Sequence, residues 1–104
     1  PILSCLTLAA TVREKSILTI EGLAKGSTLH PIQKAFVDYG AIQCGFCTPG
    51  VILTTKALLE RNSEPTREEV MEALSGNLCR CGGYVKIVDA VLAAAATMRK
   101  GGKT

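Results

Sequence analysis

Four of the five cysteines stand in two close pairs and carry the clearest chemical signal in the sequence. Cys44 and Cys47 are separated by two residues, whereas Cys79 and Cys81 are separated by one. Four thiolates on two short loops are the ligand set that a 2Fe-2S cluster requires. The same thiolates could hold one zinc ion, although four-cysteine zinc sites more often use two Cys-x2-Cys pairs. The spacing alone therefore leaves iron and zinc open.

Thiol exchange is a third interpretation of the first pair, because Cys-x-x-Cys at a helix start can lower a thiol pKa. A thioredoxin-like protein also needs alternating strands and helices, which this sequence lacks. Cys5 makes the cysteine count odd, which argues against a complete disulfide framework. Gly45 and Gly82 lie in the two cysteine loops, where tight turns can aim backbone N–H groups at sulfur. These features favour metal binding.

The other polar residues give weaker signals. His30, the single histidine, precedes Pro31 at a predicted helix start, where a structural role is the simpler interpretation. Arg80 lies between two cysteines, and its charge could raise a cluster potential or meet solvent or a partner. The sequence has no Ser/His/Asp set, phosphate-binding loop or dinucleotide fingerprint. We therefore expect no catalytic residue in this chain.

Composition indicates one compact globular unit. The 104 residues are 47% apolar and 20% charged, with a net charge of +3. Several basic residues cluster at the end and the four aromatic residues are scattered, so a nucleic-acid interface is not expected. No apolar stretch is long enough to span a membrane, and the first residues lack the features of a secretory signal. We expect a cytoplasmic location.

Apolar spacing predicts four helices, over residues 28–40, 49–61, 66–74 and 85–95. The first would present Leu29, Ile32, Phe36 and Tyr39 on one face, and the third begins with a Thr66-x-x-Glu69 capping box. Residues 16–20 are rich in β-branched side chains and predict one strand. The expected fold is mainly α, a four-helix domain with a short β remnant at the N-terminus. Each cysteine pair would lie beside a helix start, so antiparallel helices could bring all four sulfurs together.

Two segments carry a family resemblance: residues 43–50, Gln-Cys-Gly-Phe-Cys-Thr-Pro-Gly, and residues 76–84, Gly-Asn-Leu-Cys-Arg-Cys-Gly-Gly-Tyr. They resemble the two signature loops of iron-sulfur subunits in the xanthine oxidase family of molybdenum hydroxylases. Residues 19–23, 29–33 and 64–66 resemble other parts of the same domain. The resemblance favours iron over zinc, and it implies a 2Fe-2S cluster held by Cys44, Cys47, Cys79 and Cys81. It also implies that Gln43 and Cys81 lie close to the pterin cofactor.

The resemblance implies an electron-transfer subunit that is not catalytic alone. Its expected partners are a large subunit that binds molybdopterin and a medium subunit that binds FAD, or another electron acceptor. Electrons would pass from the molybdenum centre through the 2Fe-2S cluster toward a second cluster or the flavin. The alternative is a zinc-stabilised interaction domain that uses the same cysteines.

The first residues resemble the end of another domain. Ser4-Cys5-Leu6 is similar to the last ligand segment of a plant-type ferredoxin-like domain, whose three preceding cysteines are absent from this sequence. We therefore expect residues 1–27 to be a remnant of that domain with a linker. We favour a fragment of a longer subunit; the alternatives are that another chain supplies the missing half or that the second cluster has been lost. Residues 28–100 would form the helical 2Fe-2S-binding domain, and residues 101–104 a flexible tail.

Overall fold

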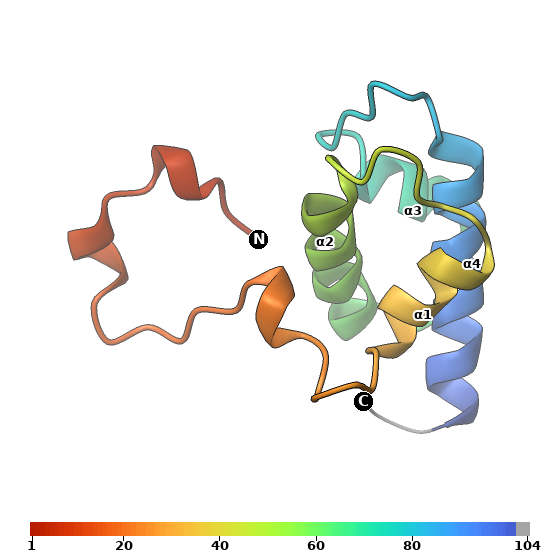
Figure 1. Cartoon of the computed structure of the whole chain (residues 1–104), viewed down its shortest axis with the longest axis horizontal. Coiled ribbons are helices and arrows are strands. Elements are labelled where there is room, and N and C mark those ends of the chain that lie inside the picture. The colour runs from red at the N-terminus through yellow and green to blue at the C-terminus, as the bar shows by residue number, and fades with distance from the viewer. Residues whose placement is uncertain (102–104) are drawn as a thin grey trace.

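Four α-helices form the body of the protein in the computed structural model, which describes residues 1–101 (Figure 1). Their bounds are Pro31–Asp38 for α1, Thr48–Arg61 for α2, Arg67–Ala73 for α3 and Tyr84–Lys100 for α4. The last helix packs against α1 and α3, and α2 also contacts both of them. The mainly-α, four-helix fold expected from the sequence is confirmed.

The core lies where the apolar stripes of the helices meet. Phe36 and Ile32 of α1 are completely buried, as predicted, together with Val51 of α2 and Val70 of α3. The buried stripe of α4 is rich in small side chains, which let the other helices approach closely: Ile87, Val88, Ala90, Val91, Ala94 and Ala95. Leu29 and Tyr39 are half exposed, so the predicted apolar face of α1 is shorter than expected. Both residues lie just outside the helix bounds, where the helical spacing no longer applies.

Two helices begin with side-chain caps. Thr66 accepts a hydrogen bond from the N–H of Glu69, and the Glu69 carboxylate accepts one from the N–H of Thr66. This is the capping box predicted for α3. At the start of α1, Nδ1 of His30 accepts from the N–H of Ile32, so the histidine has the structural role expected of it.

The predicted strand is wrong. Residues 16–19 have no regular structure, residues 20–22 form a single 3-10 turn, and strand-like pairing in residues 1–101 is limited to one bridge between Lys25 and Thr28. A β-branched run becomes a strand only when a second strand supplies hydrogen-bond partners, and the described part of the chain offers none.

The N-terminal segment lies to one side of the helices (Figure 1). Its large apolar side chains are exposed, including Ile2, Leu6 and Leu8, whereas Leu23 enters the helical core. Gly101 ends α4, and the rest of the predicted tail, residues 102–104, lies outside the described residues. Among residues 1–101, no helix is both long and apolar enough to cross a membrane.

Candidate metal centre

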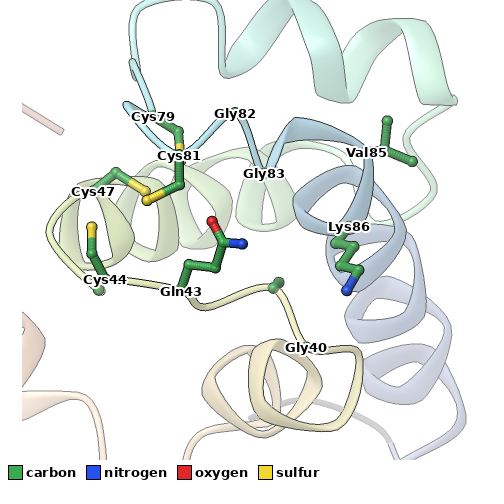
Figure 2. Close-up of a pocket in the computed structure, with 12 residues that line it drawn as sticks. Gly40, Gln43, Cys44, Cys47, Cys79, Cys81, Gly82, Gly83, Val85 and Lys86 are labelled. Atoms are coloured by element: carbon green, nitrogen blue, oxygen red, sulfur yellow. The ribbon is translucent and has the colours of Figure 1, made fainter.

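The two cysteine loops lie at the same end of the helical body (Figure 1). The first loop connects α1 to α2, and the second connects α3 to α4. Together they line a pocket of about 280 Å³ that contains all four paired cysteines (Figure 2). Cys5 and His30 do not line this pocket. The structure thus brings Cys44, Cys47, Cys79 and Cys81 together, as the sequence predicted.

The four thiols of the two loops are close neighbours. Cys44 and Cys81 are exposed and Cys47 and Cys79 are half-buried. Burial raises the pKa of Cys47, and the Cys79 thiol of the other loop raises it further. Within residues 1–101, no three His, Cys, Asp or Glu side chains are arranged around a single metal-ion position. A 2Fe-2S cluster takes four thiolate ligands, which is the set that the two loops bring to this pocket.

Backbone N–H groups point at the sulfurs. The N–H of Phe46 donates to Sγ of Cys44 over 3.5 Å, and this bond lowers the pKa of the Cys44 thiol. The N–H of Gly83 likewise lowers the pKa of Cys79, whereas burial raises the pKa of Cys47. Donors placed in this way favour the thiolate, which is the form that binds metal.

Left-handed glycines shape both loops. Gly45 has a φ of +84° and Gly82 a φ of +71°. Residues that carry a Cβ rarely adopt such positive φ values. The turn at Gly82 is closed by its N–H, which donates to the carbonyl of Cys79 over 3.1 Å. The N–H of Cys79 donates in turn to the hydroxyl of Tyr84, the first residue of α4, over 2.8 Å. The second ligand loop is therefore tied to the helix that follows it.

The helices that follow the cysteine loops differ from α1 and α3 at their starts. α2 begins after Cys47 and α4 after Gly83, and neither has a side-chain cap. An uncapped start leaves backbone N–H groups and the positive end of the helix dipole without a partner. Both starts lie at the end of the molecule that holds the thiols (Figure 1). An anionic iron-sulfur cluster bound there would supply the missing negative charge, so the residues present fit such a group.

Three residues near the cysteines complete the site. Gln43 is exposed and lines the pocket with the four cysteines. Arg80 is also exposed and does not line the pocket. Lys86 does line it, and sequence reasoning missed this residue because it belongs to the regular pattern of α4. The single signal was its position one helical turn after Gly83.

Comparison with protein families identifies this arrangement. Residues 19–92 match the model of the 2Fe-2S binding domain, which is more than half of the chain. The chain belongs to this family. The resemblance to molybdenum-hydroxylase iron-sulfur subunits, predicted from the two cysteine loops, is confirmed by its relatives.

Two relatives among the curated proteins are small subunits. The nicotinate dehydrogenase small FeS subunit of Eubacterium barkeri is 52% identical over 91 residues, which cover 88% of this chain and 58% of the relative. The nicotine 6-hydroxylase small subunit of Paenarthrobacter nicotinovorans is 58% identical over 89 residues, covering 86% and 53%. The chain therefore spans little more than half the length of these two relatives.

Solved structures agree with the fold. Quinoline 2-oxidoreductase from Pseudomonas putida 86 superposes with a TM-score of 0.90 at 48% identity, over 97% of this chain and 64% of that one. The aldehyde oxidoreductase from Desulfovibrio gigas gives a TM-score of 0.87 at 45% identity, over 93% and 11%. The helical arrangement is thus that of the family's known members.

Proposed function

We propose that this chain is the electron-transfer part of a molybdenum hydroxylase, with Cys44, Cys47, Cys79 and Cys81 as ligands of one 2Fe-2S cluster. The observation that carries the proposal is the meeting of all four paired cysteines, from two loops, at one pocket of a 2Fe-2S binding domain. When bound, the cluster accepts and releases one electron at a time. The thiols hold it, and the N–H groups of Phe46 and Gly83 orient and stabilise the sulfurs.

The pocket is proposed to hold a cofactor and not to carry out acid–base chemistry on a substrate. The pocket lining contains no histidine or carboxylate, and His30 is used as a helix cap. Substrate chemistry would therefore take place in a large, molybdopterin-binding subunit. The names of two relatives refer to nicotinate and nicotine, so an N-heterocycle is the substrate class that we propose to test first. A medium subunit that binds FAD, or another acceptor, would receive the electrons.

The surface around the pocket supports docking of the large subunit there. Phe46 and Leu78 belong to the two cysteine loops and are 91% and 80% exposed, and Val85 at the pocket edge is 72% exposed. Large apolar side chains gathered around a redox site are typical of a surface that a partner covers. Burial of the pocket under the large subunit would also shorten the path of the electron between the molybdenum centre and the cluster, and would exclude water from it.

Gln43 is proposed as the contact between the cluster site and the partner's cofactor. Its side-chain amide lies in the pocket beside the cysteines (Figure 2). An amide both donates and accepts hydrogen bonds, so it can meet a polar pterin edge without adding charge. Its polarity and its place support this role.

Residues 1–27 are proposed to be the end of a second, ferredoxin-like domain of the complete subunit together with a linker, and the linker includes the residues from 19 onward that already match the 2Fe-2S binding domain. The exposed Ile2, Leu6 and Leu8 support this proposal, because such side chains need cover from residues outside the helical body. The greater length of the small-subunit relatives supports it as well. Cys5 would then be a ligand of that other domain.

The experiment that tests the proposal is an iron, zinc and acid-labile sulfide analysis of protein purified without oxygen. We expect about two irons and two sulfides for each helical domain, and loss of both in Cys79→Ser. Cys5→Ser is the matched control, because Cys5 lies outside the pocket and its replacement leaves these two irons in place. One zinc and no sulfide would contradict the proposal and favour the zinc-stabilised interaction domain.

A further inference from the structure

Lys86 occupies a place where a cation is unfavourable for its own helix. It is the third residue of α4, whose first turn contains no acidic residue and whose start has no side-chain cap. A positive charge in the first turn of a helix opposes the positive end of the helix dipole. The lysine therefore weakens the start of α4 unless a negative charge lies close to it.

The side chain of Lys86 extends into the cysteine pocket. Its Nζ lies 3.9 Å from the point where a Cβ on Gly40 would stand, and it lines the same cavity as all four thiols. Figure 2 shows Lys86 and the cysteines on opposite sides of this cavity, with Gln43 between them in that view. The lining contains no carboxylate.

Four basic side chains of the helical body have acidic partners within residues 1–101, whereas Lys86, like Arg61, Arg80 and Lys100, has none; of these four, Lys86 alone lines the cysteine pocket. The four ion pairs of this region are Lys34–Asp38, Lys56–Glu60, Arg67–Asp89 and Arg99–Glu64. The pocket lining contains no carboxylate, so the four cysteine thiolates across the pocket are the negative groups that Lys86 faces there.

We infer that Lys86 is the charge partner of the iron-sulfur site and raises its reduction potential. This inference rests on the proposed function. Reduction adds one electron, and thus one negative charge, to a site that four thiolates already make anionic. A fixed positive charge across the pocket stabilises the reduced form more than the oxidised form. Arg80, which the sequence suggested for this effect, lies outside the pocket lining.

The test is a potentiometric titration of the cluster-loaded protein, in the complex in which it is isolated, followed by electron paramagnetic resonance. Removing the charge in Lys86→Gln should lower the reduced-to-oxidised ratio at a fixed potential about fivefold. That ratio corresponds to about 40 mV, at about 59 mV per tenfold change for one electron. Lys86→Glu should lower it further, and Lys86→Arg should keep the original potential. High salt should shrink these shifts, because Lys86 is exposed enough to be screened.

Lys100→Gln is the matched control, because it removes the same charge from the other end of α4, about 21 Å away at 1.5 Å per residue. Its potential should equal that of the original protein. If Lys86→Gln also leaves the potential unchanged while iron and sulfide contents are normal, the role of Lys86 is disproved and the electron-carrier function stands. If the original protein contains no iron and sulfide, both proposals are overturned together.

Discussion

The hydroxyl of Tyr84 accepts a hydrogen bond from the N–H of Cys79, with 2.8 Å between oxygen and nitrogen. This bond joins the first residue of α4 to a residue of the ligand loop five positions earlier in the chain. Tyr84→Phe removes the oxygen and leaves the N–H without its partner, so we expect a stability loss of about 1 kcal/mol. We also expect faster iron loss to a chelator, measured by the fading of visible absorption.

Tyr39→Phe provides the control for that experiment. Tyr39 is about as exposed as Tyr84, and its hydroxyl makes no hydrogen bond with the described residues. Its replacement should change neither stability nor the rate of iron loss. Equal rates for both variants would show that the bond to Cys79 does not secure the ligand loop.

The second ligand loop depends on the left-handed backbone of Gly82. A Cβ there would meet no atom within 4 Å, so the cost of Gly82→Ala comes from backbone strain alone. We expect a loss of about 1–2 kcal/mol in the free energy of unfolding. Gly76→Ala is the matched control, since that site is equally open and lacks a positive φ. Chemical denaturation compares the two, and a smaller loss at Gly82 than at Gly76 would contradict the strain argument.

Removal of the cluster should loosen α2 and α4 at their starts. Neither helix has a side-chain cap, whereas α1 and α3 carry capping boxes. We expect faster hydrogen exchange in the first turns of α2 and α4 after the metal is removed, with α1 and α3 nearly unchanged. Mass spectrometry of protected peptides measures this difference. Uniform loss of protection across all four helices would instead indicate global unfolding.

His30 should make stability depend on pH. Burial lowers the pKa of His30, and the charge of Lys56 lowers it further, opposed by Glu60 and assisted by Lys25. The folded state thus prefers the neutral ring, whose Nδ1 caps α1. The stabilisation is complete above the unfolded pKa of about 6.5 and is lost as the pH falls through the lower folded pKa.

The variant that isolates this effect is His30→Asn, which keeps a capping oxygen and does not titrate. Between pH 8 and pH 5 the original protein should lose about 0.5–1 kcal/mol more stability than the variant, the size of one helix cap. Thermal unfolding at both pH values gives the comparison. An identical loss in both proteins would show that the cap survives protonation of the ring.

The helices were readable from the sequence because their signals are local. The spacing of Ile32 and Phe36 marks a buried face, and Thr66 with Glu69 marks a helix start within one turn. The strand prediction at residues 16–20 failed for the opposite reason. Pairing of a strand depends on a distant partner, which β-branched composition alone does not reveal.

The candidate site was likewise predictable only in its local features. The spacing of the cysteines identified the four ligand candidates, and the glycines inside their loops indicated tight turns. The meeting of the two loops at one pocket and the entry of Lys86 into it depend on how α4 sits against the first loop. That relation is tertiary, and no local pattern encodes it.

The central claim is that four cysteines hold one redox-active 2Fe-2S cluster, and the reduced-state electron paramagnetic resonance spectrum tests it most directly. Protein reduced with dithionite should give a spin-half signal of about one spin for each cluster, and Cys79→Ser should lose it. A protein that contains zinc, or that gives no such signal with its four thiols intact, would contradict the claim.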